Sequence, residues 1–178
     1  MTSPPTDTPP DPKQLWADWT RGVVDRRSAF RTPAVATVDA DGSPRLRTVV
    51  LRGADLATRT LTFHTDLRSP KVKSLRQRPQ VAWLFYDARR KVQLRVQAFA
   101  ALWTDGPHAE AGWSRCSDFG KRTYAVEPGP GSPAAHPTSG LPKRLERGEL
   151  DSTQRDSVRS NFVVVRTQVT AIDWLWLH

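Results

Sequence analysis

Arginine and lysine residues accompany a β-type run in the first half of the sequence. The segment from Arg47 to Arg52 reads Arg-Thr-Val-Val-Leu-Arg, and side chains alternate between the two faces of a strand. Arg47 therefore shares a face with Val49 and Leu51, whereas Arg52 lies on the opposite face. The spacing predicts two guanidinium groups that flank one strand, each able to bind an anion or to contact solvent.

A second group of polar residues marks the start of a helix. Ser69-Pro70-Lys71 combines a favoured N-cap residue with a favoured first helical residue. The free N–H groups and the positive dipole end of such a helix suit a phosphate. Lys71 adds a charge, and Thr65 adds a hydroxyl from the end of the preceding strand. These residues fit either a phosphate site or an ordinary capped helix with solvated lysines.

The distribution of charge limits the class of ligand. The chain of 178 residues has a formal net charge of +9, and the segment from Arg45 to Arg95 holds thirteen Lys or Arg and three acidic residues. This segment accounts for the whole excess of positive charge. Such a local field suits a phosphorylated small molecule at least as well as a polynucleotide, and solvated strand edges are the plain alternative.

Composition indicates one soluble domain in a reducing compartment. The single cysteine, Cys116, permits no internal disulfide, so we expect a cytoplasmic protein. No segment approaches the roughly 18 apolar residues of a membrane span, and nothing near the N-terminus is typical of a signal peptide. Residues 1–12 hold five prolines and predict a disordered tail, followed by a single domain over 13–178.

The elements that would position these residues are short strands with a few helices. A hairpin turn is expected at Asp39–Gly42, and a Pro/Gly-rich loop at 127–142, which could be a lid or simply mobile. Helices are predicted over 14–29, 69–78, 107–114 and 121–126, and strands over 35–38, 45–52, 61–65, 81–86, 92–103, 161–166 and 169–177. This order predicts a mainly β fold, an antiparallel barrel with peripheral helices.

Several catalytic classes lack their sequence signatures. The chain has no Gly-x-Gly-x-x-Gly or P-loop motif, no paired Cys/His ligands for a metal, and no meaningful Ser-His-Asp spacing. These absences argue against dinucleotide-binding, kinase and metallohydrolase folds. We therefore predict no catalytic acid, base or metal ligand from the residues alone.

Five sequence blocks, in order and at compatible spacing, resemble the FMN-binding domain of the pyridoxamine 5'-phosphate oxidase family. The similarity covers roughly residues 15–103 and, more loosely, the final strands. It implies a six-stranded split β-barrel that binds FMN as a homodimer, with the cofactor between two subunits. The blocks are Gly42-x-Pro44-x-x-Arg47-Thr48-Val49-Val50-Leu51-Arg52, Phe63-His64-Thr65-Asp66, Ser69-Pro70-Lys71, Pro79-x-Val81-Ala82-x-Leu84-Phe85-Tyr86 and Gln93-Leu94-Arg95-Val96.

The resemblance also implies roles for individual residues. Arg47 and Lys71 would bind the FMN phosphate, and Gln93 would reach the flavin. His64 stands where the family has a tyrosine, and Pro70 stands where the oxidases have an arginine. The remaining cofactor contacts implied by the match are Thr48, Val49, Val50 and Leu51 beside the ring, and Thr65 and Ser69 near the ribityl or phosphate. Substrate contacts would come from Arg52 and, through the segment Ser114-Arg115, from Arg115.

Some features of the oxidases are missing. The Arg-x-His segment that holds substrate in the oxidases is absent, and Leu175 stands where they have a tryptophan. The segment Tyr124–Gly131 is similar instead to a subgroup of oxidase-like FMN proteins. FMN binding survives these differences better than turnover of pyridoxamine phosphate.

Three functional hypotheses follow. The leading one is an FMN-dependent oxidoreductase that takes a hydride from a small amine or alcohol, with or without a phosphate group, and passes electrons to dioxygen. The second keeps the barrel and replaces FMN with the deazaflavin F420, which related split barrels use. The third is a non-catalytic protein that binds flavin, haem or nucleic acid, and the nucleic-acid form ranks last because stacking aromatics are not interleaved with the charges.

Overall fold

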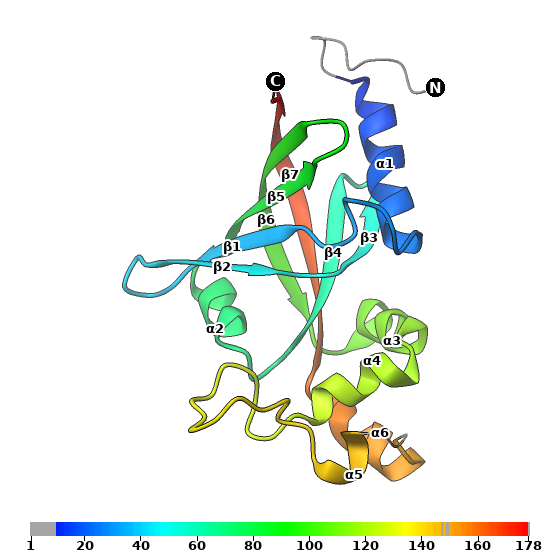
Figure 1. Ribbon diagram of the computed structural model, residues 1–178, viewed down its shortest axis with the longest axis vertical. Coiled ribbons are helices and arrows are strands. Elements are labelled where there is room, and N and C mark those ends of the chain that lie inside the picture. Colours follow the sequence, from blue (N-terminus) through cyan, green and yellow to red (C-terminus); the bar gives the residue numbers. More distant parts are fainter. Residues whose placement is uncertain (1–9, 147, 149, 178) are drawn as a thin grey trace.

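The computed structural model describes residues 10–146, 148 and 150–177 and consists of one antiparallel sheet with helices at its edges (Figure 1). Most of the predicted tail over 1–12 lies outside the described residues. Pro12 already belongs to the first helix, where Asp11 accepts a capping hydrogen bond from the Lys13 amide. The helices are α1 Pro12–Val24, α2 Pro70–Gln77, α3 Gly106–Arg115, α4 Asp118–Arg122, the 3-10 turn η1 Thr123–Ala125, α5 Lys143–Glu146 and α6 Ser152–Arg159.

The sheet is continuous across seven strands in the order β2-β1-β5-β6-β7-β4-β3. The long strand β7 connects the two parts of this sheet, because it pairs with β6 along one edge and with β4 along the other. The two outer pairs, β1–β2 and β3–β4, curl toward each other in Figure 1. The strands are β1 Ala34–Val38, β2 Pro44–Thr48, β3 Leu51–Asp55, β4 Thr60–Asp66, β5 Gln80–Asp87, β6 Val92–Trp103 and β7 Phe162–Trp176.

The core fills the inside of this curled sheet, and we call the core-lining side the inner face. Trp83 packs edge-to-face on Phe63, with ring centroids 5.5 Å apart, and its indole N–H donates to the buried Thr167 hydroxyl. Trp19 of α1 closes one opening by packing against Phe85 at 5.2 Å. Alternation along each strand sends every second side chain to the opposite side, the outer face.

The mainly β fold with peripheral helices is confirmed. The family resemblance implied six strands and the structure has seven, and the seven strands predicted from the local pattern differ from these in two places. The run 45–52 is divided between β2 and β3. The amides of Val49 and Leu51 continue the register of the β1–β2 pair by donating to the carbonyls of Pro33 and Arg31, but Pro33 has no N–H to donate in return, so β2 ends at Thr48. Conversely, the two strands predicted at 161–166 and 169–177 are one continuous strand, β7, in the structure. A bulge between Gln97 and Ala98 absorbs the change of register there.

Most other local predictions agree with the structure to within a few residues. The hairpin turn at Asp39–Gly42 forms, with Gly42 at a φ of +88° and its amide donating to the Asp39 carbonyl. Helix α1 ends at Val24, earlier than the predicted end at Ala29. The region predicted as one helix over 121–126 is divided between α4 and η1.

A second, smaller core lies under helices α3 to α6 at one end of the sheet (Figure 1). Phe162 of β7 contacts the rings of Trp113 and Tyr124, each with centroids 5.2 Å away. This helical layer covers part of the outer face of β4 and β7. None of the described helices is long and apolar enough to cross a membrane.

Candidate functional site

Strand β4 separates two groups of cationic side chains. Thr65 points to the inner face and His64, its neighbour, to the outer face, since adjacent strand residues alternate. The cross-strand pairs of His64 with Val164 and of Thr65 with Val163 follow the same alternation. Residues predicted to form one site are therefore distributed between the two faces of the sheet.

On the inner face, Arg47 of β2 and Lys71 of α2 form what we call the cation cluster. The Lys71 ammonium donates to the hydroxyls of Thr65 and Ser69, at 2.9 and 2.7 Å. The Arg47 guanidinium donates to the Thr37 hydroxyl at 2.8 Å. Four of the predicted cofactor residues, namely Arg47, Thr65, Ser69 and Lys71, thus gather at one place.

The two cations of this cluster are not neutralised by the protein. The pKa of Lys71 is lowered to about 8, mainly by burial and also by the charge of Arg47, while Asp66 acts in the opposite direction. Burial is also the main cause that lowers the pKa of Arg47. Asp66 already forms a salt bridge with Arg68, at 2.7 Å. Among the described residues, neither cation of the cluster has a salt-bridge partner, which favours an anionic ligand at this place.

Hydrogen bonds between α2 and the β1–β2 hairpin hold the cluster together. The Ser74 hydroxyl donates to the Asp39 carboxylate at 2.6 Å, and the Arg78 guanidinium donates to the carbonyls of Asp39 and Ala40. The first turn of α2 has no side-chain cap, because the Ser69 hydroxyl accepts from Lys71 instead. Within this first turn Pro70 has no N–H and the Val72 amide donates to the Ser69 carbonyl at 2.9 Å, so a ligand would meet only the remaining amides.

On the outer face, a cavity of about 310 Å³ lies between the sheet and α3. We call it the arginine pocket, because three arginines border it and none of the described lining residues carries a carboxylate. Predicted substrate residues Arg52 and Arg115 and predicted cofactor residue His64 meet here. The lining residues are Val23, Arg52, Gly53, Thr62, His64, His108, Ala111, Gly112, Arg115, Cys116, Val164 and Arg166.

His64 lines the pocket and lies next to Gly112 of α3. Its Nδ1 atom is buried and has no hydrogen-bond partner among the described residues. A Cβ atom at Gly112 would lie 3.2 Å from the His64 Nε2 atom and 2.6 Å from the Val164 side chain, so glycine favours this close approach of helix and sheet. Burial, aided by the charge of Arg52, lowers the pKa of His64 to about 4, which keeps the imidazole neutral at physiological pH.

Arg166 and His108 complete the pocket, and neither was predicted as a site residue. The Arg166 guanidinium lies 2.8 Å from the His108 Nε2 atom, and the His108 ring packs edge-to-face on Trp103. Arg166 is on β7, opposite Thr62 of β4, and so belongs to the outer face. The sequence around Arg166 reads Arg-Thr-Gln-Val and matches no motif. The only signal was that Arg166 is two residues after Val164, so that both side chains lie on the same face of a strand.

The remaining predicted cofactor residues do not join the cation cluster. Arg47, Val35, Trp83 and Val96 are paired across neighbouring strands, so their side chains all lie on the inner face. Gln93 precedes Val96 by three residues on β6. An odd separation places Gln93 on the outer face, opposite to Arg47. Within the predicted segment from Thr48 to Leu51, the Leu51 side chain is fully buried in the core, and Thr48 is exposed at the end of β2.

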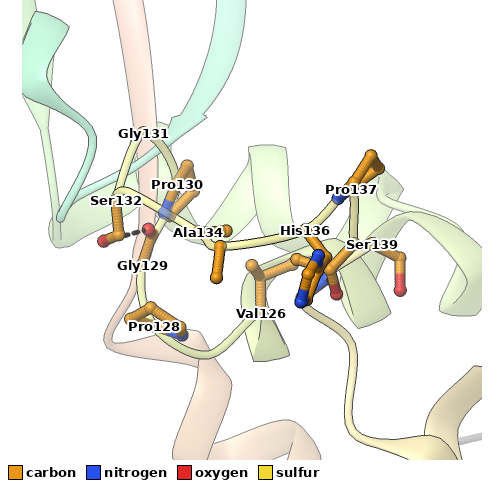
Figure 2. Close-up of a pocket in the computed structure, with 13 residues that line it drawn as sticks. Val126, Pro128, Gly129, Pro130, Gly131, Ser132, Ala134, His136, Pro137 and Ser139 are labelled. Atoms are coloured by element: carbon orange, nitrogen blue, oxygen red, sulfur yellow. Dashed lines mark hydrogen bonds between the residues drawn. The ribbon is translucent and has the colours of Figure 1, made fainter.

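The loop predicted at 127–142 contains no helix or strand and passes close to the start of α2. A Cβ atom at Gly131 would lie 3.1 Å from Pro70, and one at Gly129 would lie 3.0 Å from Arg68. Figure 2 shows the loop curling around an open hollow that it lines together with Val126. The volume of this hollow is about 630 Å³. The lining side chains are small or apolar apart from His136, so this hollow lacks the charged groups of the arginine pocket. The described residues contain no group of His, Cys, Asp or Glu that could hold a metal ion.

Comparison with known proteins agrees with these features. Residues 13–104 match the family model described as pyridoxamine 5'-phosphate oxidase, FMN-binding domain. The pyridoxine/pyridoxamine 5'-phosphate oxidase of Cupriavidus necator is 37% identical over 93 residues, which are 52% of this chain and 43% of that protein. The enzyme of the same name from Caulobacter vibrioides is 35% identical over 97 residues, 53% of this chain and 43% of that protein. The match thus spans less than half the length of these relatives.

Solved structures show the same fold over nearly the whole chain. A pyridoxamine 5'-phosphate oxidase-related, FMN-binding protein from Nostoc punctiforme superposes with a TM-score of 0.69 at 25% identity, over 96% of this chain and 87% of that one. PhzG from Burkholderia lata gives a TM-score of 0.64 at 17% identity, covering 94% and 81%, and shows the fold alone. The matched segment carries β1 to β6 and the whole cation cluster, and on this ground the chain belongs to the pyridoxamine 5'-phosphate oxidase family with its FMN-binding domain.

Proposed function

We propose that this protein is an FMN-dependent oxidoreductase whose cation cluster binds the cofactor phosphate and whose arginine pocket binds an anionic substrate. The observation that carries the proposal is the pair Arg47 and Lys71, which is partly buried without a carboxylate partner among the described residues. Placing two like charges in a partly desolvated site is unfavourable unless a ligand supplies negative charge.

The residues of the cluster fit the phosphate group of FMN. A guanidinium binds phosphate oxygens in pairs, an ammonium adds a point charge, and uncapped helical N–H groups add further donors. The hydroxyls of Thr37, Thr65 and Ser69 orient both cations before any ligand arrives. Bound FMN would supply the acceptor for a hydride, so the chain itself needs to bind, orient and shield the reactants.

Two subunits would complete the cofactor site. Gln93 and the arginine pocket lie on the outer face, whereas the cation cluster lies on the inner face, so one subunit does not place them around a single ring system. The outer face of β5 and β6 also exposes Tyr86, Phe99 and Trp103, with 49, 48 and 37% of their surface accessible. A second copy of the chain that packs on this apolar surface would bring its Gln93 and arginine pocket toward the FMN held by the first.

The test begins with an absorbance spectrum of the purified protein, with FMN added if it is colourless. Flavin binding is then titrated for the wild type, for Lys71→Ala and for the matched control Lys73→Ala, an exposed lysine on the same helix. We expect Lys71→Ala to weaken FMN binding by about 10- to 100-fold, from the 1.5–3 kcal/mol of a charge-assisted contact, and the control to change little.

A turnover assay with pyridoxamine 5'-phosphate and dioxygen follows on the FMN-loaded protein. Turnover supports an oxidase, and flavin binding without turnover leaves an FMN protein with another substrate. Binding of F420 in place of FMN, or equal FMN affinity of both lysine variants, would contradict the cofactor assignment.

A further inference from the structure

The three arginines of the arginine pocket are divided between its two ends. Arg115 is the last residue of α3. Arg52 follows Leu51, which pairs with Phe63 beside His64, and its positive charge acts on the pKa values of His64 and of Cys116 and Tyr124, the last two at the Arg115 end of the pocket. Arg166 contacts His108, which lies in the first turn of α3. His108 and Arg115 are seven residues apart, or about 10 Å along a helix axis.

None of these guanidinium groups is neutralised within the described chain. Arg52 and Arg115 have no hydrogen bond or ion pair to any described residue, and Arg166 contacts only the neutral acceptors His108 and Thr60. Of the nearby carboxylates, Glu110 forms a salt bridge with Arg159 at 2.6 Å. The pKa of Asp55 is lowered mainly by the hydrogen bond that it accepts from Thr58 and also by the charge of Arg166, with which it forms no salt bridge.

The space between the two ends is uncharged. His64 and Val164 lie beside Gly112, which is between His108 and Arg115 on α3, and Ala111 also lines the pocket. An acidic group at either end would find guanidinium donors, whereas the centre offers an imidazole and apolar contacts. The distribution of charge therefore describes the ligand: negative at both ends and uncharged in the middle.

We propose that the pocket binds a substrate with two acidic groups on a short uncharged spacer, and that Arg166 selects for the second group. This proposal rests on the proposed function and names the substrate class of the same site. One acid binds between Arg52 and Arg115. The second replaces His108 as the partner of Arg166, because a charged acceptor forms a stronger hydrogen bond with a guanidinium than a neutral imidazole does.

The test uses two probes that differ by a single acidic group. In 4-phosphonobutanoate a phosphonate and a carboxylate are joined by three methylenes, and propylphosphonate lacks only the carboxylate. Binding of each is measured by calorimetry on the full-length protein, with and without FMN. The variants are Arg166→Met, Arg52→Met and the control Arg76→Met, an exposed arginine on α2.

We expect the wild type to bind the diacid at least tenfold more tightly than the monoacid. Arg166→Met should reduce this preference to within about twofold and leave the monoacid affinity unchanged, whereas Arg52→Met should weaken both probes by about tenfold or more. Arg166→Lys keeps the positive charge and should retain part of the preference for the diacid. This variant shows whether the loss of preference in Arg166→Met comes from the missing charge or from misfolding.

Equal wild-type affinity for the two probes, no binding of either, or an equal loss of both in Arg166→Met would overturn the proposal. The proposed function is tested separately through the flavin spectrum. A preference for the diacid without FMN binding would overturn the proposed cofactor site and support the proposed substrate class. FMN binding without the preference would support the cofactor site and overturn the substrate class.

Discussion

The cation cluster and the arginine pocket lie on opposite faces of β4, and they hold their charges in different ways. In the cluster, Lys71 and Arg47 are oriented by hydroxyl groups within a packed inner face. In the pocket, Arg52 and Arg115 border an open cavity and contact no described hydrogen-bonding partner. The first arrangement is preorganised for one anion in one geometry, and the second leaves its guanidinium groups free to adapt to a ligand.

This difference indicates which site suits a permanently bound ligand and which suits a ligand that exchanges. A preorganised phosphate site suits a cofactor that remains bound, because side-chain entropy is lost during folding and not during binding. Adaptable guanidinium groups suit a substrate that enters and leaves at each turnover. The following predictions separate the two sites by changing one while the other is monitored.

The largest effect is expected when both cations of the cluster are removed. The double variant Arg47→Ala with Lys71→Ala should lower FMN affinity by roughly 3–6 kcal/mol, the sum of two charge-assisted contacts. Binding of 4-phosphonobutanoate to the arginine pocket should stay within about twofold, which calorimetry measures. If the double variant loses no more FMN affinity than one single variant, only one of the two cations contacts the phosphate.

The second effect concerns acid stability and comes from His64. Its pKa of about 4 in the folded protein lies below the ordinary value of 6.5, so only the unfolded state gains a proton as the pH falls through this range. Folding stability should therefore fall between pH 6.5 and pH 4, by up to about 3 kcal/mol at 1.4 kcal/mol per pKa unit.

Urea unfolding at pH 7.5 and pH 5 measures this loss. His64→Gln should reduce the difference between the two pH values, whereas the control His136→Gln, at an exposed loop position, should not. If the free energy of unfolding of His64→Gln falls between pH 7.5 and pH 5 by as much as that of the wild type, other groups cause the acid sensitivity.

A third effect comes from the close packing of α3 on the sheet. A Cβ atom at Gly112 would lie 2.6 Å from the Val164 side chain, so Gly112→Ala should lower stability by about 1–3 kcal/mol. It should also alter diacid binding while leaving FMN affinity unchanged. Ser114→Ala on the same helix is the control, and equal melting temperatures of the two variants would show that the helix yields without cost.

The smallest effect is the pH dependence of FMN binding. Lys71 has a pKa of about 8 before the cofactor binds, and only its protonated form attracts phosphate. FMN affinity should therefore fall as the pH rises above 8, by at most about tenfold per pH unit. Titrations at pH 7 to 9.5 measure the slope, which should vanish in Lys71→Ala and be weaker in Lys71→Arg because arginine stays charged.

Local sequence patterns predicted most of the fold and most of the cation cluster. The turn at Asp39–Gly42, the start of α2 at Ser69 and the position of Lys71 depend on residues within a few positions of each other, so spacing alone was sufficient. The family resemblance added Arg47, which local spacing identified only as one of two arginines on a strand. The structure brings Arg47 and Lys71 to one place, as the resemblance implied.

The arginine pocket was only partly predictable. Arg52 and Arg115 were expected to contact substrate, but Arg166 and His108 were missed because β7 and α3 meet only through tertiary packing. The prediction that His64 and Thr65 both contact the cofactor stays a prediction, because adjacent strand residues face opposite sides and the two lie in different groups within one subunit. The pairing of β4 with β7, roughly one hundred residues later, decides what each of them meets.

The position of β7 also has a consequence for the order of folding. The half-sheets β2-β1-β5-β6 and β4-β3 are joined by strand hydrogen bonds through β7 alone, and the pairing of β7 with β4 closes a loop of about one hundred residues. Closing such a loop is entropically costly and slow. We expect refolding to pass through a stage in which both halves are formed while the strand edges of β4 and β6 are unpaired, so aggregation during refolding should rise steeply with protein concentration.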